Sequence, residues 1–453
     1  MYFLSHSRYT ESPTLWTLQA MIMIRTFFFA EIKFRDLVLW QATIVRLAQS
    51  MNLHRLGSIV LDVRRPPNQN SRTGAPDAAS GSITDFNDMS TSDTTAFLEK
   101  LNSLRVGYIF GLSFEPHNLV AREIARKIWM GIVYSEIFLA SHLDHCYNIN
   151  CDVSSTMPPA DLDEDEVLVL NVAYRENPVA LEKRLLERRH AKSSGYNAYY
   201  SIIKSVKRQV DIENEFTMRT GHVFLDYDLV QQIDLDARQC YSALPDHLRY
   251  WNGTPPEHVR KLHLEFPYYA EQSFFFEEQY NIRLLGLHIT YMLRGMDDPM
   301  YRRSTEVCIE SARHLISMTS RISEELAMTP FGEILNRKVY LAVIVLHVAN
   351  CYGDKSFASS EISDDIRAGL IAIKNRQTMV FLTISTFFSR AVSELSDIYF
   401  TSVGSGANES ISSMNTLYED PLQWLSALGY AHLFDESRSP DGFAALNHDN
   451  VIL

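Results

Sequence analysis

Long apolar segments with helical spacing limit the fold of this chain more than any other feature of its sequence. In the segment 37–57, "LVLWQATIVRLAQSMNLHRLG", apolar residues recur every three or four positions, which places them on one helix face. The members of this stripe are Leu37, Trp40, Ile44, Leu47 and Met51. Similar stripes occur within residues 124–137, 284–291, 308–319, 339–346 and 366–373. No comparable run alternates as a strand would, and no fixed-period repeat occurs, so the sequence predicts an all-α protein.

The amino-acid composition limits the kinds of protein to which this chain can belong. The 453 residues are 46% hydrophobic, enough for one large core or two to three ordinary domains. The 24 Phe and 22 Tyr residues argue against a mostly disordered chain. A formal net charge of −13 gives no general attraction to phosphate backbones, so direct nucleic-acid binding by these residues is disfavoured.

The cysteines and the apolar runs bear on the cellular compartment. Five widely spaced cysteines (residues 146, 151, 240, 308 and 351) do not suit a disulfide framework and indicate a reducing compartment. The polar middle of the first 16 residues does not suit a secretory signal. The longest apolar stretch, Val339–Tyr352, contains His347 and Asn350 and is shorter than the roughly 20 residues a bilayer span needs. We expect a core helix there.

The chain is predicted to form one extended helical domain over residues 1–400. A polar insertion at 62–95, rich in Pro, Ser, Thr, Asn and Asp, interrupts this domain and is expected to be disordered. Residues 401–453 form a linker, most polar over 401–413, and a short C-terminal segment.

The segment "HLDHCYNINC", His142–Cys151, is the most tempting metal candidate. Its His142, His145, Cys146 and Cys151 are ligand types that zinc prefers. The spacing matches no standard finger, which joins one close ligand pair to another close pair further on. We therefore expect a helix end that runs into a polar loop, with no metal in this chain.

Two charged segments are interpreted as solvated helix surfaces. The acidic run Asp161–Glu166 fails as an EF-hand, because Glu166 stands where Gly is needed and Val172 where a bidentate Glu is needed. It suits a helix start after Pro158-Pro159, where acidic side chains complement the helix N-terminus. The basic segment 182–192 places Arg184, Arg188 and Lys192 on one side of a helix.

No catalytic constellation can be assembled. Serine nucleophile elbows, Gly-rich phosphate loops and HExxH helices do not occur in the sequence. His288 and His347 lie in apolar segments and are expected to be hydrogen-bonded core histidines. We therefore predict no catalytic and no cofactor residue. The aromatic segment Phe266–Tyr280, "FPYYAEQSFFFEEQY", is the best candidate for a pocket or interface lining, with ordinary core packing as the alternative.

Four short motifs occur in a characteristic order along the chain. An "LHR" tag closes the first stripe at Leu53–Arg55, and an "R-x-x-W" helix follows at Arg126–Trp129. A Pro-rich turn with acidic residues covers 158–163, and an "LH-x-x-Y" helix covers 287–291. This order resembles the fungal-specific transcription factor regulatory domain, the middle homology region of binuclear zinc-cluster and zinc-finger regulators. The resemblance covers about residues 12–320 and more faintly extends to 399. By this resemblance, Asn52–Arg55 is a packing signature at a helix end.

The resemblance implies an all-α regulatory domain that controls RNA polymerase II transcription in the nucleus and is not an enzyme. Such a domain senses a small-molecule effector or a protein partner, and occupancy shifts it between two arrangements. The implied partners are regulator proteins, the transcriptional machinery or a second copy of the chain, with no membrane. No zinc cluster or finger precedes the motifs, so zinc and DNA contacts are expected only in an N-terminal module missing from this chain. Met130 also stands where a second Trp is common, and Glu136 where an Asp is frequent.

Two other functions stay open. The first is an all-helical metal-dependent enzyme that acts on diphosphate substrates through Asp161–Glu166, which needs a second acidic cluster facing the first. The second is a protein without a DNA-binding module that binds to intact regulators.

Overall fold

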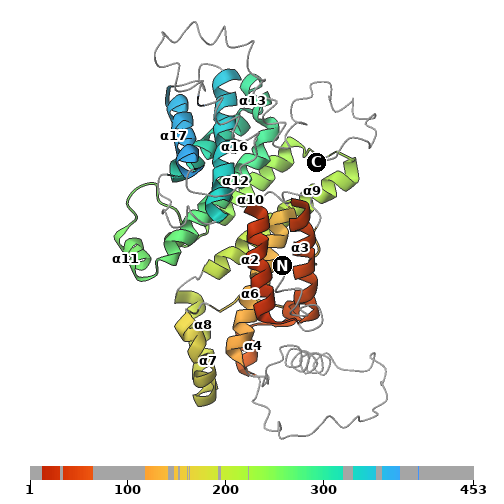
Figure 1. Cartoon of the computed structure of the whole chain (residues 1–453), viewed down its shortest axis with the longest axis vertical. Coiled ribbons are helices and arrows are strands. Elements are labelled where there is room, and N and C mark those ends of the chain that lie inside the picture. Colours follow the sequence, from red (N-terminus) through yellow and green to blue (C-terminus); the bar gives the residue numbers. More distant parts are fainter. Residues whose placement is uncertain are drawn as a thin grey trace. The chain divides into compact units, whose positions relative to one another are not determined.

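All regular secondary structure in the described part of the chain is helical, which confirms the predicted all-α class (Figure 1). The computed structural model describes residues 13–30, 34–64, 118–140, 147–150, 154–160, 162, 164–191, 195–222, 224–319, 330–352, 360–377 and 396. None of the helices in these ranges combines the length and apolarity that a membrane crossing requires. The described residues group into two compact units, both within the predicted 1–400 domain.

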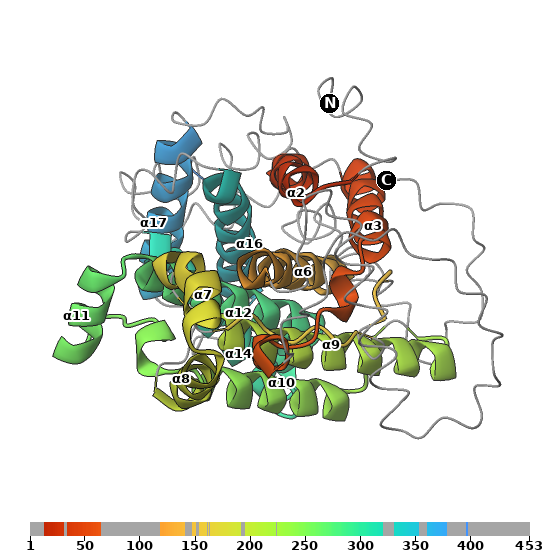
Figure 2. The same ribbon diagram turned by 90° about the horizontal axis from the view of Figure 1, so that it is seen from below.

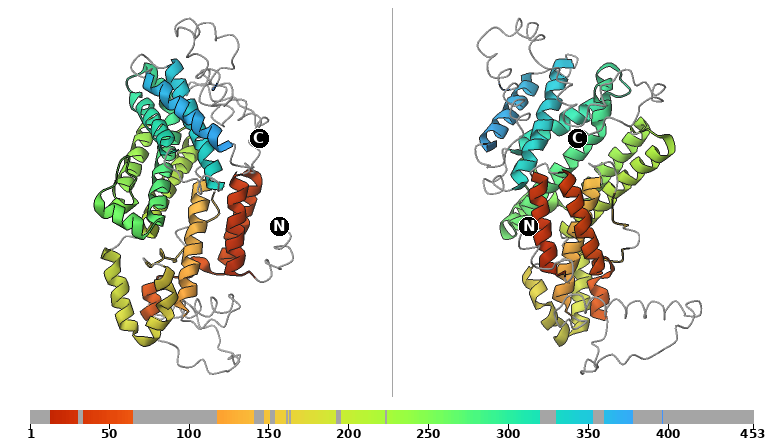
Figure 3. Two further views of the ribbon diagram at one scale, coloured as in Figure 1. Left: turned by 60° about the vertical axis from the view of Figure 1, so that its left-hand side comes forward. Right: turned by 45° about the vertical axis from the view of Figure 1, so that its right-hand side comes forward.

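Unit 1 contains the N-terminal helices and the residues of the first three motifs (Figures 1 and 3). Its elements are α2 (Leu15–Ala30), α3 (Phe34–Ser50), the 3-10 turn η1 (Leu53–Arg55), α4 (Ile59–Arg64), α6 (Leu119–Ala140), α7 (Glu164–Glu176), α8 (Pro178–Ala191), α9 (Gly195–Thr220), η4 (Asp246–Leu248), α11 (Glu257–Glu265), the end of α10 (Tyr227–Ser242) and the start of α12 (Tyr268–Met292). Several helix starts have a local cause. Asn118 accepts a hydrogen bond from the Ala121 amide at the start of α6, and Asn177 caps α8 just before Pro178.

The predicted stripe of α3 forms the centre of unit 1. All five of its residues, Leu37, Trp40, Ile44, Leu47 and Met51, are buried. Trp40, Ile44, Leu47 and Met51 pack with α2 and α6, which run alongside α3 (Figure 3). Two polar side chains of α3 also reach backbone groups of its neighbours. Trp40 Nε1 donates to the Met21 carbonyl at 2.9 Å, and Gln41 Nε2 donates to the Ile132 carbonyl at 3.2 Å.

Unit 2 is built around the most apolar helix of the C-terminal half. Its elements are the start of α10, the larger part of α12, α13 (Arg294–Asp297), α14 (Arg302–Met318), α16 (Pro330–Tyr352) and α17 (Ser360–Gln377). Helix α16 packs against α14 and α17 (Figure 2). The predicted stripes within 284–291, 308–319, 339–346 and 366–373 are buried. Apolar residues of the last three share the core around α16, whereas α12 contributes Leu285, Ile289 and Met292 to this core in place of the predicted stripe. The expectation that Val339–Tyr352 is a core helix is therefore confirmed.

The predicted polar insertion begins later than expected. Helix α4 continues through Arg64, and Asp62 and Val63 are buried. Composition alone placed Asp62 with the polar residues that follow, because an isolated Asp gives no sign of a buried ionic partner. The remainder of the insertion lies outside the described residues, as does the predicted 401–453 segment.

Substitution of two glycines in the "LLGLHITYMLRG" segment (284–295) by alanine should change the free energy of unfolding in opposite directions. A Cβ on Gly295 would overlap the Tyr301 carbonyl and the Thr305 hydroxyl, which is held by a 2.6 Å hydrogen bond to the Met292 carbonyl. We expect Gly295→Ala to destabilise the chain by about 1–3 kcal/mol. A Cβ on Gly286, inside α12, meets nothing within 4 Å, so Gly286→Ala should stabilise by up to about 1 kcal/mol. Urea denaturation of both variants checks this, and equal effects would refute the described α13–α14 junction.

Candidate functional site

The "LHR" tag forms a tight turn that directs backbone carbonyls into unit 1. Asn52 has a positive φ of 58°, a conformation Asn tolerates better than most residues. Leu53–Arg55 then forms one 3-10 turn, and Gly57 has a φ of 65°, which favours glycine. The chain thereby leaves the helix direction immediately after α3. This confirms the interpretation of Asn52–Arg55 as a helix end, and the turn leaves carbonyl groups that need donors.

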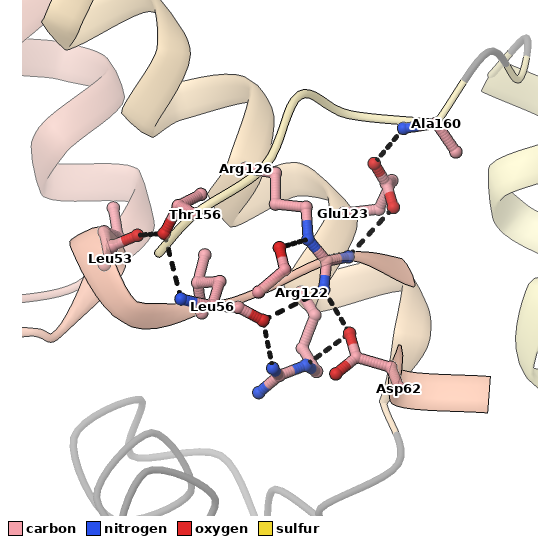
Figure 4. Close-up of polar contacts among 9 residues, drawn as sticks. Leu53, Leu56, Asp62, Arg122, Glu123, Arg126, Thr156 and Ala160 are labelled. Atoms are coloured by element: carbon pink, nitrogen blue, oxygen red, sulfur yellow. Dashed lines mark hydrogen bonds and ion pairs between the residues drawn. The ribbon is translucent and has the colours of Figure 1, made fainter. Parts of the chain in front are cut away.

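Two arginines of α6 supply those donors (Figure 4). Arg122 Nη2 donates to the Leu56 carbonyl at 2.7 Å. Arg126 donates to the Leu56 carbonyl through Nη2 at 3.2 Å and to the Gly57 carbonyl through Nε at 3.0 Å. Both arginines are also ion-paired with Asp62 of α4, Arg122 at 2.7 Å and Arg126 in closer contact. Each guanidinium thus joins α6 to the turn and to the helix that follows it.

Glu123 completes this group, which we call the arginine cluster: Asp62, Arg122, Glu123 and Arg126. Its carboxylate is 3.0 Å from Arg126 Nη1 and accepts a 2.6 Å hydrogen bond from the Ala160 amide. Burial raises the pKa of Glu123, against the opposing effect of the Arg126 charge. Two positive and two negative charges balance, which is how buried charges are tolerated in a protein interior.

The segment 154–157, which leads into the Pro-rich turn, closes the other side of the same region. Backbone amides of Ser155 and Met157 donate to the carbonyls of His54 and Gly57 at 2.9 and 3.1 Å. The Thr156 hydroxyl donates to the Leu53 carbonyl and accepts from the Leu56 amide (Figure 4). On α6, Trp129 Nε1 donates to Ser154 Oγ at 3.2 Å, and its ring lies 5.9 Å from that of His54.

Three stretches that are far apart in the sequence therefore meet at one place. The "LHR" tag with the two residues that follow it, the "R-x-x-W" helix, and the segment 154–157 that leads into the Pro-rich turn are joined by side-chain and backbone hydrogen bonds. All four members of the arginine cluster are at most 4% exposed. Such a cluster can hold α4, α6 and the turn in register, but it offers no charged group to a substrate in solvent.

Unit 2 contains a second polar group, which we call the histidine cluster: Tyr227, Asp234, His288 and Ser304, of which all but the partly buried Asp234 are buried. His288 Nδ1 is 2.8 Å from Ser304 Oγ, and Nε2 is 3.4 Å from Asp234 Oδ1. Ser304 Oγ is in turn 3.4 Å from the Tyr227 hydroxyl. This order of Asp, His and Ser is that of a hydrolase triad. However, Ser304 is 0% exposed, so it has no path to a substrate in this structure.

Two further tyrosine rings pack against Tyr227 of the histidine cluster. The rings of Tyr227, Tyr291 and Tyr301 lie 4.9–5.1 Å apart, and the Arg294 guanidinium lies 5.7 Å from the Tyr291 ring. Burial raises the pKa of Tyr291 to about 12. The expectation that His288 is a hydrogen-bonded core histidine is confirmed, and the "LH-x-x-Y" motif supplies both His288 and Tyr291 to this packing.

The remaining sequence candidates are dispersed. His347 is buried in α16, 3.7 Å from Cys351 Sγ, and burial lowers its pKa to about 4. His142, His145, Cys146 and Cys151 lie outside the described residues. Within the described part of the chain, no group of three or more His, Cys, Asp or Glu is placed to hold a metal ion.

The two charged segments lie where helices were expected. Helix α7 begins at Glu164, which confirms the helix start after Pro158-Pro159. Its Glu166 is ion-paired at 2.7 Å with the exposed Arg184 of α8. The side chains of Asp161, Asp163 and Arg188 lie outside the description, as does Lys192.

The aromatic segment Phe266–Tyr280 has two roles. Tyr268 is 43% exposed and belongs to unit 1, whereas Phe274 and Phe276 are buried in unit 2. Phe274 packs in the main core of unit 2, as the core-packing alternative predicts. Its last turn also carries two buried carboxylates, Glu277, which is 2.8 Å from His314 Nε2, and Glu278, which is ion-paired with Lys338.

Sequence reasoning missed the arginine cluster, although a signal was present. Arg122 and Arg126 are four residues apart in a helix that is otherwise strongly apolar on that face. Two arginine side chains four residues apart lie on the same face of a helix. If that face is buried, their charges need buried carboxylates or carbonyl groups as partners.

Comparisons of the chain with protein-family models, with curated proteins and with solved structures gave no match. The function is therefore argued from the residues and their geometry.

Proposed function

We propose that the chain is a transcription-regulating domain of the fungal zinc-cluster type. It acts in the nucleus on RNA polymerase II transcription, and a separate N-terminal module supplies the DNA contacts and any zinc. The observation that carries the proposal is the set of hydrogen bonds among the stretches that bear three of the motifs. Arg126 binds the Gly57 carbonyl just after the "LHR" tag, Trp129 binds Ser154 just before the Pro-rich turn, and Glu123 binds the Ala160 amide inside that turn. Because these stretches recur together in the family pattern, we expect them to depend on one another.

The character of the two polar clusters also supports a regulatory domain over an enzyme. The arginine cluster is buried, as are Tyr227, His288 and Ser304 of the histidine cluster, and the members of each cluster contact one another. A catalytic group has to contact its substrate. A regulatory domain instead needs a stably folded structure whose conformation shifts when an effector or protein partner binds. The partners of such a domain are other regulators or the transcriptional machinery.

A tethering assay tests this proposal. The full chain is fused behind a heterologous DNA-binding module, and transcription of a reporter carrying that module's sites is measured in a fungal host. We expect the fusion to raise or lower the reporter at least several-fold relative to the module alone. Arg126→Met should weaken the effect by destabilising unit 1, whereas Arg184→Met, at an exposed ion pair, should preserve it. A folded, nuclear fusion without any effect on the reporter would contradict the proposal.

A further inference from the structure

The segment Trp251–Thr254, "WNGT", contains the one place in the sequence where an asparagine is followed by a glycine. It lies between the 3-10 turn η4 and helix α11, and the backbone bends at Asn252 and Gly253. Asn-Gly pairs favour such bends. Asn252, Gly253 and Thr254 are all exposed, so the pair is open to water and lies outside the hydrogen-bonded ladder of a helix.

An asparagine in this setting can react with its own backbone. The side-chain Cγ of Asn252 is a carbonyl carbon, and the amide nitrogen of the next residue can close a succinimide ring upon it. A side chain on that next residue crowds the approach of the nitrogen, whereas glycine has no Cβ. A Cβ built on Gly253 would meet nothing within 4 Å, so there is room around Gly253 for the backbone to rearrange.

We propose that Asn252 and Gly253 form a self-modification site, at which Asn252 converts slowly to aspartate and isoaspartate. The Gly253 nitrogen gives its proton to water and bonds to Asn252 Cγ. The bond from Cγ to Nδ2 breaks, and Nδ2 takes up a proton and leaves as ammonia. Water then opens the succinimide at either of its two carbonyl carbons. The net reaction consumes one water and releases one ammonia, with no oxidation or reduction.

The two products differ in what they do to the chain. Both add one negative charge at position 252, but in isoaspartate the main chain runs through Cγ and is one atom longer. The change follows closely after Tyr250, which packs against the main core of unit 2. The Tyr250 ring lies edge-on to the rings of Phe274 and His314, at 6.2 and 5.6 Å. Isoaspartate therefore alters the path of the chain beside an anchored ring, and the conversion acts as a slow timer on the stability of unit 2.

The first experiment follows the conversion in the folded full chain. The chain is kept for days in mildly alkaline buffer, and only the samples withdrawn are unfolded, digested and measured by mass spectrometry. Asn252 should convert steadily to the acid. Asn197, which is exposed on α9 and followed by Ala198, is the internal control and should stay an amide. Gly253→Ala should slow the conversion by about an order of magnitude, because its Cβ crowds the attacking nitrogen. If Asn252 converted no faster than Asn197, the proposal would be overturned.

The second experiment measures the consequence for unit 2. Ion exchange separates aged chains with the added charge, and peptide mapping gives their isoaspartate content. Urea unfolding then compares this fraction with the fresh chain and with Asn252→Asp. The isoaspartate-bearing fraction should unfold at lower urea, whereas Asn252→Asp, which adds the charge alone, should unfold like the fresh chain. If all three unfolded alike, the modification would not act on the packing of Tyr250, and the timer would be refuted.

Discussion

Replacing Arg126 by methionine is expected to destabilise the chain by about 3–5 kcal/mol, because it leaves buried carboxylates without a counter-charge. Arg126 is 0% exposed and is ion-paired with both Asp62 and Glu123. It also satisfies the carbonyls of Leu56 and Gly57. A loss of this size is a large fraction of the stability of an ordinary domain. Denaturant unfolding followed by circular dichroism measures it.

Two matched variants separate the charge from the geometry of Arg126. Arg126→Lys keeps the charge but loses the planar fork that reaches four acceptors, so its cost should lie between those of the wild type and Arg126→Met. Arg184→Met removes an arginine from an exposed pair with Glu166 and should cost about 0–1 kcal/mol. If Arg126→Met proved as mild as Arg184→Met, the arginine cluster could not be buried as described.

His347 is expected to make unit 2 sensitive to mild acid. Burial lowers its pKa from an ordinary value of 6.5 to about 4, so the folded state holds fewer protons than the unfolded state between these values. The stability that depends on neutral His347 is therefore fully present above the pKa of histidine in the unfolded chain. It is lost as the pH falls towards the pKa of His347 in the folded chain. This group alone should remove about 2 kcal/mol of stability between about pH 7.5 and pH 5. Unfolding free energies measured across this pH range give the slope.

The pH effect of His347 is isolated by a neutral substitution. His347→Gln keeps a polar side chain that does not titrate, so the fall in stability over this range should be about 2 kcal/mol smaller than in the wild type. His258→Gln, at a side chain that is 65% exposed, controls for removal of a histidine from the surface. Parallel pH profiles for the wild type and His347→Gln would show that His347 is not buried in a closed core.

The all-α class and most of the buried helix faces can be predicted from the sequence, because the apolar residues on the buried face of a helix recur about every 3.6 residues. Every residue of the stripe Leu37–Met51 is buried, as are the stripes of α14, α16 and α17. The division into two units does not follow from this pattern. A helix such as α12 has apolar residues on several faces, and its hydrophobic period does not say which end packs with which neighbours.

The polar clusters could be predicted only in part. The "LHR" tag was recognisable as a helix end, because Asn52 and Gly57 tolerate positive φ. The pairing of Arg126 with Asp62 joins residues 64 positions apart, and no local rule relates them. Likewise, His288 was identifiable as a core histidine, but its contacts with Asp234 and Ser304 depend on how α10, α12 and α14 pack.

The contact between the "LHR" region and the segment that leads into the Pro-rich turn is tested most directly by hydrogen exchange at two backbone amides. The amides of Ser155 and Met157 lie outside any helix, and they donate to the carbonyls of His54 and Gly57 at 2.9 and 3.1 Å. We predict that both exchange as slowly as the interior amides of α6, and that both lose this protection in Arg126→Met. Exchange of these two amides in the unaltered chain at the rate of an unstructured peptide would contradict the account.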